Sequence, residues 1–501
     1  MEFLPKPIAV AAIFAVFLYT FLLISRLIVQ RNRSKKRAAP EADGAWPVIG
    51  HLHLLGGPKP TFMVLGKMAD KYGPIFSMMM GVHQILVVSS WEIAKDCLTT
   101  NDKVFANRPR TIALELLGYN FSMIGFSPYG SYWRQVRKIA TLELLSNHRL
   151  ERLKHVRQSE GFGGHEKKVW GRTLKVILRI IVGKRISLQE GDESNDKWKE
   201  ELTNFFELSG KFVVSDALPF LRWLDIGGIE ILMKKSAKKL DIVVQGWLEE
   251  HKSKRVSSEM KEEEDFMDVM LFLLDDPNEF PDRDVDTVIK ATCLALILAA
   301  SDTTAITLTW ALSLLLNNRH VLKKAQNELD VQIGTGRQVN ESDMKNLIYL
   351  QTILKETMRL YPAAPLAIPH ESMEDCKVQD YHVPAGTRLF LNLWKIHRDP
   401  HVWKDPCKFQ PERFLTTHKE VDVRGQNFEL LPFGSGRRMC PGVSFAQQVM
   451  QLTLAALLHS FDFATPLDEA VDMGEGLALT LEKAAPLQVL ITPRLSASLY
   501  G

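Results

Sequence analysis

One run of residues, Ala291–Leu316, limits the folds open to this chain more than any other part of its sequence. The run is apolar nearly all round, and the helix predicted around it, from Val285 to Asn317, would be about 50 Å long. Such a helix either crosses a membrane or passes through the core of a large domain. Its middle carries Asp302, and a carboxylate at the centre of a bilayer costs about 2.5–3.5 kcal/mol. We therefore predict a core helix, in which Asp302 needs buried partners or a cavity.

The composition agrees with a globular protein and excludes several other classes. Hydrophobic residues make up 46% of the 501 residues and charged residues 24%, which excludes collagen-like and disordered chains. The formal net charge of +3 gives no general attraction to nucleic acid. The 5 cysteines include no C-x-x-C pair, which disfavours a disulfide framework or a cysteine-based zinc module and favours a reducing compartment. No feature of the sequence implies an oligomer.

The N-terminus predicts a membrane anchor. Ile8–Ser25 is uncharged and strongly apolar, and a helix of this length spans about 27 Å, close to the thickness of a bilayer's hydrocarbon core. A basic cluster from Arg31 to Arg37 follows, and the positive-inside rule keeps it in the cytosol. A cleaved signal peptide fits less well, because the positive charge lies after the apolar segment. We predict a signal anchor over 1–30, a basic stop and proline hinge over 31–50, and a cytosolic domain over 51–501.

Beyond the hinge, the apolar pattern predicts a mainly α protein with a small β-sheet region. Helices are predicted at Glu92–Thr99, Ser131–Leu144, Trp198–Lys211, Ile229–His251, Val285–Leu316, Val321–Gly334 and Leu350–Leu360. Strands are predicted at Ile75–Met79, Ile85–Val88 and Arg388–Asn392, and near the C-terminus within Leu479–Ile491.

The most specific string is P-F-G-S-G-R-R-M-C-P-G, from Pro432 to Gly442. Its three glycines allow the backbone to approach a flat object closely, and a tight loop presents one cysteine, Cys440. Backbone N–H groups, Arg438 and the start of the helix predicted near Val443 would stabilise a thiolate. A single thiolate suits a metal that four other ligands already hold, such as haem iron. The alternative is a glycine-rich turn with an inert buried cysteine.

This string resembles the cysteine loop of the cytochrome P450 family, F-x-x-G-x-R-x-C-x-G, at every fixed position. The matching residues are Phe433, Gly436, Arg438, Cys440 and Gly442. The resemblance implies the cytochrome P450 fold and a bound haem b, with these residues around the cofactor and Cys440 as its axial metal ligand. In that role the thiolate pushes electron density toward the iron.

Two further motifs agree with this family. Trp133 and Arg137, in W-x-x-x-R, are implied to face a haem propionate, where a fixed cation neutralises a carboxylate. Glu356 and Arg359, in E-x-x-R, are implied to form a buried ion network with Arg413 of P-E-R-F. By itself E-x-x-R is more often a surface pair on one helix face. We interpret the network as part of the architecture and not of the catalytic machinery.

The segment Ala299–Thr304 resembles the oxygen-activating motif of the family, [AG]-G-x-[DE]-T-[TS]. The resemblance implies that Asp302 and Thr303 are catalytic, with Asp302 relaying protons from solvent to Thr303. Ala300 stands where the family usually has glycine, and its methyl group should narrow the groove that receives O₂. The alternative is that these polar residues only cap a helix kink.

The order of anchor, hinge and motifs resembles that of microsomal plant P450s, and strings such as 308–318 resemble the plant P450 family numbered eighty-two. This implies a monooxygenase in the endoplasmic reticulum membrane that receives electrons from NADPH through NADPH–cytochrome P450 reductase. Arg437, Arg438 and Lys408 are candidates for docking the reductase. One region, Gln158–Val182, looks shorter than its counterpart in the relatives.

The resemblance also implies a small, apolar substrate and an apolar pocket for it. The pocket residues are Leu116, Leu117, Met123, Phe205, Phe206, Leu296, Ala299, Ala300, Ala367, Ile368, Leu477 and Leu479. The set contains no Lys or Arg, so a substrate carboxylate or phosphate would lack a buried partner. Each buried CH₂ contributes about 0.8 kcal/mol, so a rigid hydrocarbon skeleton would bind well. Terpenoid hydroxylation is therefore the first choice, and oxidation of a flavonoid, another phenolic or an alkaloid comes next.

Two other functions stay open at this point. The first is a haem-thiolate isomerase or dehydratase of the allene oxide synthase kind, which needs neither O₂ nor a reductase. The second is a non-enzymatic b-type electron carrier, although such a carrier usually has two axial ligands and no apolar pocket. NADPH-dependent turnover would separate the monooxygenase from both.

Overall fold

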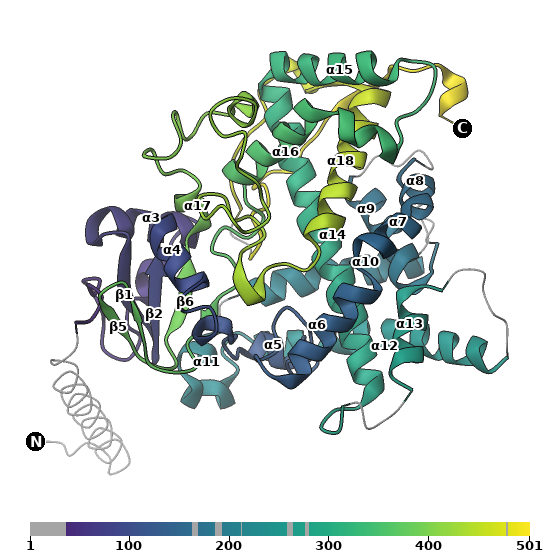
Figure 1. Ribbon diagram of the computed structural model, residues 1–501. Coiled ribbons are helices and arrows are strands. Elements are labelled where there is room, and N and C mark those ends of the chain that lie inside the picture. The colour runs from purple at the N-terminus through teal and green to yellow at the C-terminus, as the bar shows by residue number, and fades with distance from the viewer. Residues whose placement is uncertain are drawn as a thin grey trace, which may run out of the picture.

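The long apolar helix predicted from the sequence is α14, Val285–Asn317, and it runs through the helical part of the computed structural model (Figure 1). It begins where Asp284 Oδ2 accepts the backbone N–H of Thr287 at 2.8 Å, an N-cap that satisfies one of the free donors of the first turn. Among the described residues it is the one helix long and apolar enough to span a membrane, but most of its side chains are buried in protein. The predicted core position is therefore confirmed.

The structure describes residues 37–162, 169–185, 193–211, 213–257, 264–275, 280–476 and 479–500. The predicted anchor and the first part of the basic stop lie outside the described residues, and so does Leu477 of the predicted pocket.

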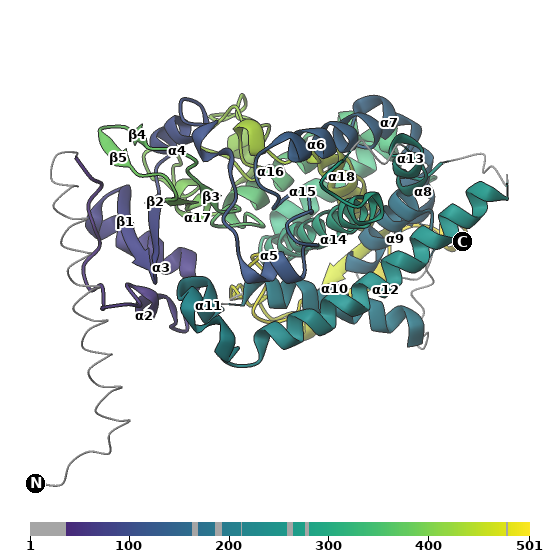
Figure 2. The same cartoon turned by 90° about the horizontal axis from the view of Figure 1, so that it is seen from below.

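Helices surround α14 on several sides (Figures 1 and 2). The earlier ones are α2 (Leu52–Leu55), α3 (Thr61–Tyr72), α4 (Trp91–Leu98), α5 (Ile112–Leu116), α6 (Ser131–Glu143), α7 (Asn147–Arg152), α8 (Lys154–Phe162), α9 (Val169–Val182), α10 (Glu193–Gly210), α11 (Val214–Ala217), α12 (Ile229–Val256) and α13 (Phe266–Leu273). The later ones are α15 (Arg319–Ile333), α16 (Ile348–Leu360), α17 (Leu393–Ile396) and α18 (Val443–Ser460). Each predicted helix is present, although α10 begins five residues earlier than predicted and α12 ends five residues later.

The shortened region Gln158–Val182 contains the end of α8 and the whole of α9. Helix α9 packs against α14, and its buried side chains, among them Leu174, Ile177 and Leu178, belong to the same hydrophobic cluster as Leu294 of α14. The described part of this region therefore contributes to the core.

A small sheet lies beside the helices, in the strand order β1-β2-β6-β3 (Figure 1). Its strands are β1 (Ile75–Met80), β2 (His83–Val88), β3 (His370–Glu371) and β6 (Arg388–Leu391). β1 pairs antiparallel with β2, β2 runs parallel to β6, and β3 pairs antiparallel with β6. Three of the four predicted strand regions therefore form this sheet. The other strands form two separate pairs: β4 (Cys376–Val378) with β5 (Tyr381–Val383), and β7 (Phe461–Ala464) with β8 (Leu490–Pro493).

The strand predicted within Leu479–Ile491 is wrong for most of its length, because only Leu490 and Ile491 belong to a strand, β8. Pro486 has no N–H to give to a ladder. Among the residues before it, Lys483 forms only an isolated antiparallel bridge, with Glu475, and Leu481 contacts two other parts of the protein. The Leu481 N–H donates to the Ala363 carbonyl at 2.9 Å, and the Leu481 carbonyl accepts the indole N–H of Trp310 at 2.6 Å.

Candidate functional site

The loop that carries Cys440 leads into α18, which packs against α14. The Cys440 N–H donates to the Phe433 carbonyl at 2.9 Å and closes the loop. Gly436 has a φ of +67°, and a Cβ there would lie 2.4 Å from Asp102 Oδ1 and 2.8 Å from the Leu98 carbonyl oxygen. Only glycine fits this position. Gly436 thus lets the loop pack closely against residues at the end of α4 and just after it, whereas the predicted approach of the glycines to a flat object stays a prediction.

Cys440 is open to solvent on one side, and the protein packed around its sulfur affects the charge of the thiol. Burial raises the pKa of the thiol, whereas the Gly442 backbone N–H and the charge of Arg137 lower it. The sequence predicted Arg438 as the cation beside the sulfur, and the structure places Arg137 there instead. A metal at the accessible side of the sulfur would favour the thiolate directly.

One face of α14 is open in the middle of this otherwise buried helix. Ala299 is exposed there, and Ala300 and Thr303 are partly exposed. Residues four apart lie above one another on a helix, and the Thr303 hydroxyl donates to the Ala299 carbonyl at 2.7 Å. Asp302 is buried: it is 8% exposed, its Oδ2 has no hydrogen-bond partner among the described residues, and burial followed by the charge of Glu482 raises its pKa to about 7.

Three arginines gather near the Cys440 loop: Arg108 and Arg438 are buried, and Arg137 is partly buried. Arg438 donates to the Ala106 and Ser127 carbonyls at 2.6 Å each, and its Nη1 is buried without a partner. Arg108 donates to the Ile368 and Pro369 carbonyls at 2.7 and 3.0 Å, and Arg137 donates to the Met439 carbonyl.

Within the described part of the chain, no carboxylate pairs with these three arginines. Burial lowers the pKa of each, and their mutual repulsion lowers it further for Arg108 and for Arg438, to about 9 in the latter. A buried positive cluster needs anionic partners. The two propionates of a haem are such partners, so the residues present fit this group.

Trp133 contributes its ring to the cluster. It is 4% exposed, and its indole N–H donates to the Ile124 carbonyl at 3.0 Å. The guanidinium carbons of Arg438 and Arg137 lie 4.3 and 5.2 Å from its ring centroid. Trp133 therefore holds two of the arginines by cation–π contact.

Replacement of Arg108 by leucine is expected to accelerate haem loss by about ten- to a hundredfold, the effect of losing one buried charge-assisted hydrogen bond. The rate of haem transfer to an excess of an acceptor protein measures it. Arg110→Leu is the matched control, because Arg110 is exposed and outside the cluster. Equal rates for the two variants would contradict the role of Arg108, which no sequence motif singled out.

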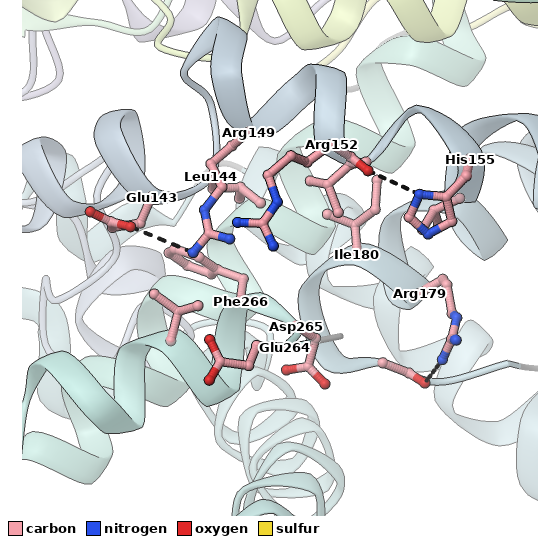
Figure 3. A pocket seen from close by; sticks show the side chains of 14 residues that line it. Glu143, Leu144, Arg149, Arg152, His155, Arg179, Ile180, Glu264, Asp265 and Phe266 are labelled. Carbon is pink, nitrogen blue, oxygen red and sulfur yellow. Dashed lines mark hydrogen bonds and ion pairs between the residues drawn. The ribbon is translucent and has the colours of Figure 1, made fainter. Parts of the chain in front are cut away.

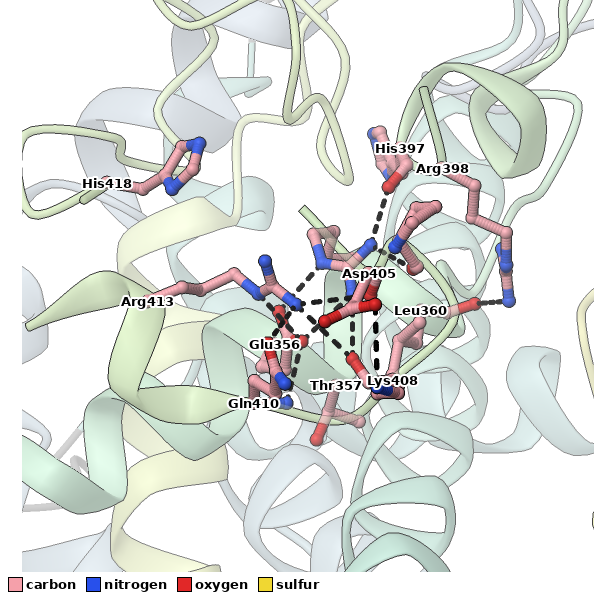
Figure 4. A network of polar contacts seen from close by, with 12 residues as sticks. Glu356, Thr357, Leu360, His397, Arg398, Asp405, Lys408, Gln410, Arg413 and His418 are labelled. Atoms are coloured by element: carbon pink, nitrogen blue, oxygen red, sulfur yellow. Dashed lines mark hydrogen bonds and ion pairs between the residues drawn. The ribbon is translucent and has the colours of Figure 1, made fainter. Parts of the chain in front are cut away.

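Glu356, Arg359 and Arg413 form one buried network (Figure 4). Arg359 Nε and Nη2 donate to Glu356 Oε2 and Oε1 at 2.7 and 2.9 Å, and Arg413 Nε donates to Glu356 Oε1 at 3.1 Å. Glu356 and Arg359 are 0% exposed and Arg413 is 5% exposed. Both guanidiniums lie over the buried ring of Trp403. The E-x-x-R pair is thus part of the core and not a surface pair.

His397 connects this network to the Cys440 loop, a link that sequence reasoning missed. Its carbonyl accepts Arg359 Nη1 at 2.8 Å, and its ring Nε2 accepts the Leu431 N–H at 2.9 Å, directly before the loop (Figure 4). Burial lowers the pKa of His397 to about 3, so the ring stays neutral and keeps this acceptor.

The predicted pocket residues lie in more than one place. Seven of them share one hydrophobic cluster: Leu116, Leu117, Met123, Phe205, Phe206, Leu296 and Ala300. Ala367 packs against a different cluster, and Ile368 and Leu479 are 37% and 41% exposed. The seven residues of the shared cluster come from α5, α10, α14 and the loop after α5, and they include Ala300 on the open face of α14.

A separate pocket of about 380 Å³ opens between α7, α9 and α13 (Figure 3). Arg149 and Arg152 lie above Glu264 and Asp265 in this view, and Arg179 lies to the right of the two carboxylates. None of the predicted site residues borders it. Its charged walls suit water and ions better than an apolar substrate.

One of the three residues predicted to dock the reductase needs correction. Arg438 is 9% exposed, so it is not available on the surface to dock a reductase. Arg437 remains on the surface, but its Nε forms an ion pair with Asp102 Oδ2 at 3.1 Å. Lys408 is exposed and pairs with Asp405 at 3.4 Å.

Comparison with known proteins agrees with this geometry. The family model for cytochrome P450 matches residues 40–162 and 168–490. The chain is 49% identical to strychnine-10-hydroxylase of Strychnos nux-vomica, with 98% of each chain covered. It is also 49% identical to xanthotoxin 5-hydroxylase CYP82C4 of Arabidopsis thaliana, over 98% of this chain and 99% of the relative. A solved zebra fish cytochrome P450 with progesterone superposes with a TM-score of 0.71 at 26% identity, over 87% of this chain and 100% of that chain.

Proposed function

Because this chain belongs to the cytochrome P450 family and is a hydroxylating monooxygenase related to the plant family numbered eighty-two, we propose that it hydroxylates a rigid polycyclic plant metabolite. We propose further that NADPH–cytochrome P450 reductase supplies the electrons. The observation that carries the substrate proposal is the apolar cluster beside the open face of α14, which includes Phe205, Leu296 and Ala300.

Haem b, when bound, supplies the redox-active iron for oxygen activation. Cys440 would hold the metal, while Arg137 and the Gly442 N–H stabilise the thiolate charge. Arg108 and Arg438 would hold the propionates, and the phenylalanine and leucine side chains of the apolar cluster exclude water from the substrate side. The Thr303 hydroxyl is placed on the open face of α14 to pass a proton to a reacting oxygen.

The choice among substrates follows from the chemistry of this apolar cluster. Its apolar residues favour burial of fused rings, and none of them offers a cation to a carboxylate or phosphate. Plant relatives of similar identity are named for hydroxylation of an alkaloid, a flavonoid and a coumarin. These classes therefore take precedence over the terpenoid skeleton that the sequence favoured, which stays as a further candidate.

Yeast microsomes that contain the chain and a P450 reductase provide the test. With a panel of alkaloids, flavones, coumarins and terpenes, we expect products that carry one added oxygen and that form only with NADPH. Turnover confined to terpenes would contradict the proposed order of substrates. Products formed without NADPH or O₂ would instead support an isomerase of the allene oxide synthase kind.

The proposed location is the endoplasmic reticulum membrane, with the catalytic domain in the cytosol. Its support is an apolar surface around the short helix η2, Pro219–Leu224, and the start of α12. Exposed side chains there are Phe220, Trp223, Leu224, Ile226, Ile231 and Leu232, with Trp223 at 81%. Val82, at the turn between β1 and β2, adjoins this surface, because its N–H donates to the Ala217 carbonyl at 3.0 Å. An exposed apolar patch of this kind suits a lipid surface.

The orientation can be tested at a glycosylation sequence, Asn120-Phe121-Ser122, whose asparagine is exposed. A cytosolic domain never meets the glycosylation machinery, so we expect Asn120 to stay unmodified. The mass of the chain from microsomes is measured before and after endoglycosidase treatment. A decrease in mass that disappears in Asn120→Gln would place the domain in the lumen and overturn the proposed orientation.

A further inference from the structure

Two buried oxygens near the middle of α14 lack hydrogen-bond partners. Asp302 Oδ2 and Thr480 Oγ1 are both buried, and the two residues are 8% and 6% exposed. The Thr480 hydroxyl is close enough to lower the pKa of Asp302, yet neither oxygen completes a hydrogen bond of ordinary geometry. Buried polar groups are rarely left in this state, and a water molecule between them would satisfy both.

The segment that carries Thr480 is fixed against α14. Trp310, two turns after Asp302, donates its indole N–H to the Leu481 carbonyl at 2.6 Å and stacks on Tyr361 at 3.8 Å between ring centroids. The Glu482 N–H donates to the Thr480 carbonyl at 2.9 Å. These contacts hold the segment from Thr480 to Glu482 against α14.

Glu482 follows Thr480 by two residues and reaches solvent. Its side chain is exposed, and its charge raises the pKa of Asp302, while burial and then Glu207 of α10 raise the pKa of Glu482 itself. Glu207 is on the surface and pairs with Lys211 at 2.9 Å. A carboxyl group that is accessible to water and retains its proton more readily is suited to collect protons.

The two lysines near Glu482 and Glu207 contact other groups than Asp302. Lys483 donates to the Asp472 carbonyl, and its Nζ lies 4.8 Å from the Trp310 ring centroid. Lys211 pairs with Glu207. The pKa of Asp302 is thus shifted by burial, by Glu482 and by Thr480, and no cation is among the groups that shift it.

We propose that Glu482 and Thr480 form the solvent side of a proton relay that ends at Asp302 and Thr303. Glu482 takes a proton from bulk water, and the Thr480 hydroxyl with one bridging water passes a proton on to Asp302. Asp302 gives its proton to the Thr303 hydroxyl, which in turn donates its own proton to the reacting oxygen. Each group that gives up a proton receives another, so the relay returns to its starting charge. This inference rests on the proposed monooxygenase function, and Glu482 acts as a positioning residue through Asp302.

Two substitutions separate the relay from a structural effect, because they move the pKa of Asp302 in opposite directions. Glu482→Gln removes a neighbouring negative charge and should lower the pKa of Asp302. Thr480→Val removes a hydroxyl that favours the carboxylate and should raise it. Both should lower product formed per NADPH several-fold and raise peroxide release, as Thr303→Ala should. Glu482→Asp should restore part of the coupling.

The pKa of Asp302 is measured in the resting protein, by infrared titration of the protonated carboxyl band that Asp302→Asn removes. Glu469→Gln is the control, because Glu469 is exposed in the same C-terminal part of the chain. It should change neither the pKa nor the coupling. An Asp302 pKa that is equal in the parent chain and in Glu482→Gln would overturn the relay, as would normal coupling in both relay variants. Failure of the parent chain to oxygenate any substrate would overturn the proposed function instead. The infrared titration would still show whether Glu482 shifts the pKa of Asp302.

Discussion

Replacement of Cys440 by alanine is expected to abolish the thiolate-type Soret band of the reduced carbon monoxide complex and all NADPH-dependent oxygenation. The side chain of Cys440 is the exposed sulfur of the family loop, and Arg137 and the Gly442 N–H favour its thiolate. Alanine offers no ligand to the iron and loses the electron density that favours O–O cleavage. Absorbance difference spectra of the reduced protein with and without carbon monoxide measure the change.

Cys407→Ala is the matched control, because Cys407 is also an exposed cysteine and lies outside the loop. It should keep both the band and the activity. A thiolate-type band that persists in Cys440→Ala would end the assignment of Cys440 as the axial ligand. Cys440→Ser should lose oxygenation even where it retains haem, because an alkoxide or hydroxyl does not replace the thiolate.

Replacement of Glu356 by alanine is expected to cause the largest loss of stability. It leaves the guanidiniums of Arg359 and Arg413 buried with no counter-charge within hydrogen-bond reach. Removal of one partner of a buried ion pair costs about 3–5 kcal/mol, a large share of the stability of an ordinary domain. We therefore expect little folded, haem-containing protein, as measured by the ratio of haem to polypeptide after expression.

Glu356→Gln keeps the shape and part of the hydrogen bonding, so it is the variant whose unfolding by urea is measured directly. We expect its free energy of unfolding to be lower than that of the parent chain, but the decrease should be smaller than in Glu356→Ala. Glu420→Ala is the control, because Glu420 is 89% exposed in its side chain and its ion pair with Lys419 is a surface pair. Haem content in Glu356→Ala equal to that of this control would show that the network does not support the fold.

The contacts of His397 explain why such a loss should reach the metal site. Arg359 donates to the His397 carbonyl, and the Leu431 N–H donates to the His397 ring just before the Cys440 loop. When Arg359 loses Glu356, the contact that positions His397 loosens as well. We therefore expect the position of Cys440 to depend on Glu356 through the hydrogen bonds of Arg359 and His397.

The sequence by itself determined the features that depend on neighbours along the chain. The apolar run with Asp302 in its middle required a core helix, because a carboxylate is too costly inside a bilayer. The Cys440 loop and the E-x-x-R pair could be found because their residues are close in sequence and their spacing is fixed by a turn and by one helix face. The mainly α architecture followed from periodicity in the same way.

Only the tertiary structure decided which distant residues meet. Arg108 joins Arg137 and Arg438 from a loop that carries no motif, and Arg438 is buried where the sequence allowed a surface position. The strand expected after Leu479 became a segment held by Ala363 and Trp310. These arrangements depend on which backbone and side-chain groups the packed helices bring together and remove from water, and local periodicity contains no information about those partners. For this reason the tertiary structure alone placed Glu482 and Thr480 beside Asp302.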